Sequence, residues 1–258
     1  MKHLNTFILA ALCVVLISAM LVSCSDEDTP PKPPIIEKID IYRGLRNTFA
    51  YSSSMVVDYK DGNVNSLVLG SPTMHVSFSY YPNDSVSFDY YQQDVYGEYH
   101  EGRSSLQISN GIARICKSSR LGNVVYSYDN NYLTNTIFGD TQVNYIWKDG
   151  NLSSITSTNP LYKTDFTPSS VVNDYNIDLN IINQLIDQRE KYRNVRNTFA
   201  QMIDLLGKRS KYLLEDSQYY YKYTFDDTGK LSSIFIRLKK PDLEAKVEVY
   251  AFVFYYSK

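Results

Sequence analysis

Short runs of alternating apolar and polar residues, separated by turn signals, recur along most of the chain. A period of two is typical of β-strands that bury one face. Two-residue type I′ hairpin turns need positive φ, which glycine, asparagine and aspartate accept at low cost. The pairs best suited to such turns are Asp61-Gly62, Asn110-Gly111 and Asp149-Gly150. Weaker turn signals fall at 82–84, at 129–131 and at 226–229, which ends in Gly229. The pattern therefore predicts a series of hairpins in a mainly antiparallel β domain.

The strand after each turn carries two aliphatic residues three positions apart. The pairs are Val64/Leu67, Ile112/Ile115, Leu152/Ile155 and Leu231/Ile234. Residues three apart on a regular strand point to opposite faces. Either both faces of the sheet are partly covered, or a β-bulge changes the register of each strand. Both alternatives predict a strongly curved sheet, as a hairpin meander or a half-open barrel.

A helical period interrupts this β pattern between about residues 178 and 207. Apolar residues recur every three or four positions over 179–192 and again over 195–206, and Gly207 supplies a stop signal for the second stretch. Two helices here would cover one face of the sheet. We therefore expect one domain over 37–258, mainly β with a small α insertion: a curved antiparallel meander or half-open barrel covered by two helices.

The first 23 residues have the features of a secretory leader. An apolar run from Phe7 to Val22 ends in Leu21, Val22, Ser23 and Cys24. This segment resembles a bacterial lipoprotein signal, in which the three residues before the cysteine form the lipobox. The resemblance implies cleavage before Cys24 and acylation of that residue with fatty acids such as palmitate. The alternative is a plain transmembrane anchor, for which the run is somewhat short against the roughly 20 residues needed.

Residues 24–36 are expected to form an extended, flexible tether, because they are polar and contain four prolines. Asp26, Glu27 and Asp28 follow the cysteine directly. They resemble the export signal that carries some Gram-negative lipoproteins to the outer face of the outer membrane, and a solvated linker is the alternative. The sequence thus predicts a protein attached to the membrane by lipid and exposed on the cell surface.

The hairpin copies also resemble a known repeat. The best copies span 59–67, 147–155 and 225–234, each with an aromatic residue before the turn. They are similar to the YD repeat of bacterial surface and toxin-shell proteins, and more closely to a domain-of-unknown-function family of bacterial lipoproteins. The segment Asn176-Ile177-Asp178-Leu179-Asn180 also looks like that family. The resemblance implies a fold and carries over no catalytic residue.

Composition excludes several functional classes. A net charge of −2 over 258 residues argues against nucleic-acid binding, which usually needs a basic excess. Beyond Cys24, the mature chain contains only Cys116, so no disulfide framework or cysteine zinc site can form, and we expect Cys116 to be buried. His75 and His100 stand in no nucleophile–base or metal-ligand pattern. We therefore predict no catalytic residue, metal site or cofactor.

Tyrosine is the one compositional excess, with 24 in the chain. Adjacent tyrosines on a strand face opposite ways, so some rings must reach solvent, where they suit a glycan or protein partner. The alternative is that tyrosine serves here only as a strand former. The sequence thus favours a non-catalytic surface lipoprotein that binds a glycan or a protein. The other hypotheses are a carrier that holds an apolar ligand in a half-barrel cavity, and a hydrolase whose site is assembled from distant residues.

Overall fold

The computed structural model describes residues 33–257 except 46–47, 71–72, 94–98, 119–121, 159–160, 183–199, 202 and 240–248. The chain divides into two units, Met1–Pro33 and Pro34–Lys258, and every described strand belongs to the second. The predicted leader, the lipobox, Cys24 and the acids at 26–28 lie outside the described residues.

The second unit is built almost entirely from antiparallel strands, which confirms the predicted mainly β class. The strands are β1 (Ile36–Leu45), β2 (Thr48–Lys60), β3 (Asn63–Gly70), β4 (Thr73–Tyr81), β5 (Ser85–Gln93), β6 (Tyr99–Ser109), β7 (Ile112–Ser118), β8 (Val124–Asp129), β9 (Tyr132–Phe138), β10 (Thr141–Lys148), β11 (Asn151–Thr158), β12 (Leu161–Val172), β13 (Tyr212–Asp216), β14 (Tyr219–Phe225), β15 (Leu231–Leu238) and β16 (Val249–Tyr256).

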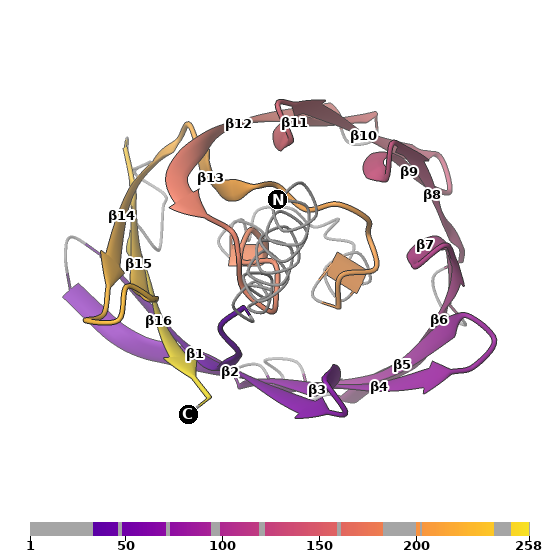
Figure 1. Cartoon of the computed structure of the whole chain (residues 1–258), viewed down its shortest axis with the longest axis horizontal. Helices are drawn as coiled ribbons and strands as arrows, with labels where there is room; N and C mark the ends of the chain where they lie inside the picture. Colours follow the sequence, from indigo (N-terminus) through magenta and orange to yellow (C-terminus); the bar gives the residue numbers. More distant parts are fainter. Residues whose placement is uncertain are drawn as a thin grey trace, which may run out of the picture. The chain divides into compact units, whose positions relative to one another are not determined.

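These strands form one 16-stranded sheet that curves into a nearly closed barrel (Figure 1). Sequential neighbours pair from β13 back to β1, and β1 then pairs with β16, followed by β15 and β14. The two ends of the sheet are therefore β13 and β14, which are consecutive in the chain. Side-chain bonds mark the corner between them: Asp216 N donates to Tyr221 Oη at 3.1 Å, and Gln218 N donates to Asp216 Oδ1 at 2.7 Å.

The bulge alternative accounts for the aliphatic pairs three residues apart. Opposite β2, the register steps from Ser66 to Val64, so Asn65 is an extra residue and both Val64 and Leu67 face the core. The same step between β14 and β15 buries both Leu231 and Ile234. Each bulge follows a tight turn and helps to curve the sheet.

Two of the predicted pairs behave differently. In β7 the register places Ala113 and Cys116 at the equivalent buried positions, one residue after the predicted Ile112 and Ile115. In β11 the register places Leu152 and Ile155 at the positions equivalent to Val64 and Leu67, but both side chains are only half-buried. The bulge is therefore present in all four strands, whereas the residues at its two inward positions vary.

Apolar side chains fill the inner face of the sheet, whereas the outward face is mixed and also carries exposed apolar residues such as Val56, Val125 and Ile137. Over β4–β6 the buried apolar residues of the inward face are Val76, Phe78, Val86, Phe88 and Leu106. They belong to one core cluster with residues 177–182, which lie within the ring of strands (Figure 1). The outward neighbours between them are Ser77, Ser79, Ser87, Asp89, Arg103, Ser105 and Gln107.

The segments 173–182 and 200–211, between β12 and β13, run through the interior (Figure 1). Within the described residues the backbone is helical only at Ile181–Ile182 and Ala200–Gln201, so the two predicted covering helices are not supported there. Residues 179–180 and 203–206 are turns, bends or irregular, and residues 183–199 and 202 of the predicted helices lie outside the described residues. In the described part of the chain, no helix is long and apolar enough to cross a membrane.

Candidate functional site

The predicted turn residues have left-handed backbone conformations. Their φ values are 52° and 80° at Asp61 and Gly62, 53° and 74° at Asn110 and Gly111, 52° and 79° at Asp149 and Gly150, and 81° at Gly229. Paired positive values are those of a type I′ turn. All of these turns join an even-numbered strand to the next odd-numbered one, so they lie at one end of the barrel. Strand β1 begins at this same end, directly after the predicted tether.

The second interior segment crosses three of the hairpins at this end. Its residues 205, 208 and 211 each form one backbone hydrogen bond with a different hairpin. The bonds are Ala113 N to Leu205 O at 2.7 Å, Lys208 N to Asn131 O at 2.7 Å, and Lys211 N to Gly150 O at 3.2 Å. The segment therefore acts as a strap across the inner ends of β6 to β11.

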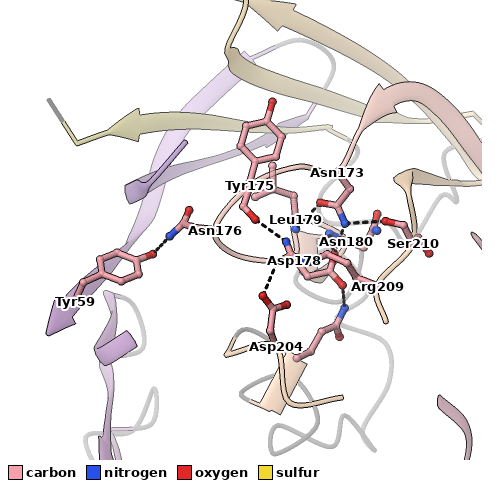
Figure 2. Close-up of polar contacts among 11 residues, drawn as sticks. Tyr59, Asn173, Tyr175, Asn176, Asp178, Leu179, Asn180, Asp204, Arg209 and Ser210 are labelled. Atoms are coloured by element: carbon pink, nitrogen blue, oxygen red, sulfur yellow. Dashed lines mark hydrogen bonds and ion pairs between the residues drawn. The ribbon is translucent and has the colours of Figure 1, made fainter. Parts of the chain in front are cut away.

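A buried polar network holds the two interior segments together (Figure 2). Its centre is the carboxylate of Asp178, which accepts hydrogen bonds from Asn173 Nδ2 at 2.8 Å, Asn180 N at 2.9 Å and Gln201 Nε2 at 2.8 Å. Asn173 Oδ1 accepts from Leu179 N at 3.2 Å, and its Nδ2 also donates to Ser210 O at 3.3 Å. Residues 176–180, which carry the family resemblance, thus lie in a buried hydrogen-bond network with a structural role.

The same loop fixes the start of β1. Asn176 Oδ1 accepts from Ile36 N at 2.8 Å, and its amide nitrogen contacts the hydroxyl of Tyr59 (Figure 2). Tyr59 Oη donates in turn to Ile36 O at 2.9 Å, and burial raises the pKa of this phenol to about 12. Asn176 N also reaches Pro34 O at 3.3 Å. The loop therefore clamps the point at which the predicted tether joins the barrel.

Asn180 occupies the edge of the sheet at β13. Its Oδ1 accepts from Leu214 N at 2.7 Å, and its Nδ2 donates to Tyr212 O at 3.4 Å. The side-chain amide of Asn180 thus hydrogen-bonds backbone groups at the edge of β13, as a neighbouring strand would. Beside it, Arg209 forms an ion pair with Asp204, and its Nη1 donates to Tyr175 O at 2.6 Å (Figure 2). Both interior segments are consequently fixed to the seam as well as to the hairpins.

Little space remains near this seam. A cavity of about 10 Å³ lies between the first interior segment and β13–β15, with an almost wholly apolar lining that includes Leu179, Ile234 and Ile236. A volume of this size is at the lower limit for one water molecule. This cavity is too small for an apolar ligand such as a fatty acyl chain, and the carrier hypothesis stays a prediction.

The remaining candidate residues occupy structural positions. Cys116 is fully buried, as predicted. Trp147 Nε1 donates to Leu133 O at 2.7 Å, and its ring centroid lies 4.8 Å from that of Tyr132, so it packs between hairpins. His75 is exposed, and the side chain of His100 is not described. Among the described residues, no group of three or more histidine, cysteine and acidic side chains is placed to hold a metal ion.

Sequence reasoning missed most of the network around Asp178. It singled out 176–180 by resemblance, but it did not connect this loop with Asn173, Asp204, Arg209 or Ser210. The available signal was the density of asparagine and aspartate over 173–180, because such residues are unfavourable within a helix and favour local side-chain bonds. That signal argued against beginning a helix at residue 178.

Comparison with known proteins gives one informative result. No family model matches the chain, and no curated protein matches it in sequence. Among solved structures, the fold is similar to that of a porin-like protein from Bacteroides uniformis. The TM-score is 0.56 at 14% sequence identity, over 86% of this chain and 98% of that chain. At this identity the likeness establishes a shared fold, a β-barrel of the porin-like type.

Proposed function

We propose that this protein is a lipid-anchored outer-membrane lipoprotein, displayed on the cell surface, whose plugged barrel is a non-catalytic scaffold for binding at its outer wall. The observation that carries this proposal is the polarity of the wall over β4–β6, where buried apolar side chains face the interior and two neighbouring outward rows consist of serine, aspartate and arginine. Membrane-spanning barrels have the opposite arrangement, with an apolar band facing lipid and a polar lumen.

The outer wall of β2–β6 shows the contrast. Residues paired across these five strands form one outward row, and they are Asp58, Ser66, Ser77, Asp89 and Arg103. Arg103 and Asp89 form a two-pronged ion pair, with Nε–Oδ1 at 2.6 Å and Nη2–Oδ2 at 2.9 Å. An arginine facing lipid at the bilayer midplane costs about 2–4 kcal/mol. This row favours water, which supports membrane attachment through another part of the chain.

The interior argues against a diffusion pore. The two interior segments are bonded to β1 through Asn176, to β7 through Leu205 and to β13 through Asn180. These contacts lie on different sides of the ring (Figure 1), and the two segments contribute residues to one core cluster with the strands. They support a plugged lumen within a porin-like fold.

Acylation of Cys24 would supply the missing attachment. Ile36 lies twelve positions after Cys24, and a fully extended chain over twelve positions reaches about 40 Å. Several acyl chains give stable anchoring, at about 0.8 kcal/mol per buried methylene. The clamp formed by Asn176 and Tyr59 would transmit this attachment to the barrel.

The proposal is tested by expressing the chain and its Cys24→Ala variant in a Gram-negative host that is fed labelled palmitate. We expect label and outer-membrane fractionation for the parent chain, and neither for the variant. Outer-membrane fractionation of an unlabelled variant would contradict the lipid anchor. The purified parent protein should also produce no channel steps in a planar lipid bilayer, and regular conductance steps would contradict the plugged scaffold.

Surface display has its own test. Replacing Asp26, Glu27 and Asp28 by alanine should leave labelling intact and reduce the fraction that external protease cleaves on whole cells. The matched control replaces Thr29, Pro30 and Lys32, which changes the tether and keeps its acids. Unchanged cleavage in the first variant, or equal loss in both, would contradict the export signal.

A further inference from the structure

A cluster of tyrosines surrounds an acid–lysine pair on the outer wall of β16, β1 and β2. Three outward rows pass through it, one above the other along the strands. The rows are Ala251–Tyr42–Tyr51, Val253–Asp40–Ser54 and Tyr255–Lys38–Val56. The middle row has only short side chains, whereas the rows on either side carry large rings. Tyr51 is 58% exposed and Tyr255 is 43% exposed, so two of these rings face solvent.

The polar pair lies between the rings. Lys38 Nζ is 2.9 Å from Asp40 Oδ1 and 3.2 Å from Oδ2, and it lies 4.9 Å from the ring centroid of Tyr255. The nearby Asp40 carboxylate also raises the pKa of the Tyr255 phenol. On the other side, the rings of Tyr42 and Tyr51 meet edge to face, with centroids 5.8 Å apart. The cluster thus joins a carboxylate, an ammonium group and three aromatic rings.

Asp40 carries a charged side chain on the outward face, yet only 5% of its surface is exposed. The carboxylate is covered by neighbouring side chains and not by the core, and the lysine that pairs with it remains 40% exposed. A carboxylate has about four acceptor positions, so it can accept further hydrogen bonds when a ligand displaces part of this cover. An ordinary surface ion pair would need no such enclosure.

We propose that Tyr51, Tyr255, Asp40 and Lys38 form a binding site for a neutral pyranose unit of a glycan. The C–H face of a sugar ring suits the electron-rich face of an exposed tyrosine. A vicinal diol requires one acceptor and one donor side by side, which Asp40 and Lys38 supply. The inference names the ligand class for the outer-wall binding proposed above and rests on that proposal.

The outward row that contains Lys38 continues along the wall. It passes through Val56, Val68, His75 and Tyr91 on β2 to β5, and these side chains are all exposed. From Tyr255 to Tyr91 the row covers five strand spacings, roughly 24 Å. It ends in a second exposed tyrosine, so it offers a path for further sugar units. The site therefore fits a polysaccharide better than a free monosaccharide.

The test is affinity electrophoresis of the mature protein, in its purification detergent, through native gels containing mannan, laminarin, dextran or galactan. We expect at least one polysaccharide to retard the protein. Tyr51→Ala and Asp40→Asn should each raise the dissociation constant at least fivefold without lowering the melting temperature. Tyr220→Ala is the matched control, because that tyrosine is 60% exposed and lies outside the cluster on β14.

The possible results separate cleanly. No retardation in any of the four gels would overturn the proposal, and so would an equal loss of binding in Tyr220→Ala. Full binding by both Tyr51→Ala and Asp40→Asn would place the glycan elsewhere and overturn this site. None of these outcomes affects palmitate labelling or outer-membrane fractionation, so the lipoprotein proposal is tested separately.

Discussion

Replacement of Asn173 by alanine should destabilise the barrel more than its size suggests. The side chain lies at the junction of both interior segments, and Asn173 as a whole is only 5% exposed. Its loss removes the bond to Leu179 N at 3.2 Å, the bond to Asp178 Oδ1 at 2.8 Å and the bond to Ser210 O at 3.3 Å. Asp178 keeps two donors, whereas Leu179 N loses its side-chain acceptor.

The magnitude follows from these contacts. A buried donor left without a partner costs about 1–3 kcal/mol, and a hydrogen bond to a charged group contributes about 1.5–3 kcal/mol. Leu179 and Asp178 are 1% and 4% exposed, so water cannot replace the lost partner without rearrangement. We therefore expect a loss of about 3–4 kcal/mol in the free energy of unfolding. This is a large share of the total of about 5–15 kcal/mol for a typical domain.

Urea unfolding of residues 34–258, followed by circular dichroism, measures this loss. The control is Asn65→Ala, which removes one bond of 2.7 Å from Asn65 Nδ2 to Asp58 on the solvent side. That change should cost about 1 kcal/mol or less, because water replaces the bond. Equal losses in the two variants would refute the view that the buried network secures the interior segments.

Three further predictions test other parts of the fold. Gly111→Ala should lower the free energy of unfolding by about 1–2 kcal/mol, because φ is +74° there, although no atom lies within 4 Å of the new Cβ. The control Gly70→Ala should be nearly neutral. Similar losses in the two variants would argue against backbone strain. The pKa of Tyr59 is raised to about 12, so its stabilising effect is complete below pH 10 and is lost as the pH rises toward 12. Burial also raises the pKa of Tyr80 to about 12, so Tyr59→Phe should reduce but not abolish the tyrosinate absorbance that appears near pH 12, and leave the rise near pH 10 unchanged. In residues 34–258, Cys116 should react with a thiol reagent only after urea unfolding, and rapid reaction of the native protein would contradict its burial.

The hairpins could be predicted from sequence because their signals are local. A type I′ turn needs two residues that accept positive φ, and Asp149-Gly150 supplies both within two positions. The bulge was also visible, as a spacing of three between Val64 and Leu67, although the sequence left two explanations open. Only the register against β2 decides between them, because both explanations give the same one-dimensional pattern.

The interior network could not be predicted in the same way, because its partners are distant in the sequence. Asn176 contacts Tyr59 from 117 positions away, and Leu152 N donates to Ser210 Oγ from 58 positions away. The apolar period over 179–192 indicated a helix, yet the side chains of Asp178 and Asn180 accept hydrogen bonds from backbone groups, from Asn180 N and from Leu214 N on β13 respectively. Tertiary contacts of this kind outweigh local propensity, which differs by less than about 1 kcal/mol between ordinary residues.

The polarity of the wall joins the two kinds of information. Alternation in Val76-Ser77-Phe78-Ser79 shows that one face of β4 is apolar, but the sequence does not say whether that face meets lipid or core. The curvature of the sheet turns the valine and phenylalanine inward, into the core cluster that also contains Ile177 and Leu179. The serines of β4 therefore face outward beside Asp89 and Arg103, whereas a membrane-spanning barrel presents an apolar band to lipid. This part of the wall supports the proposal that the protein is attached to the membrane through acylated Cys24 and not through its strands.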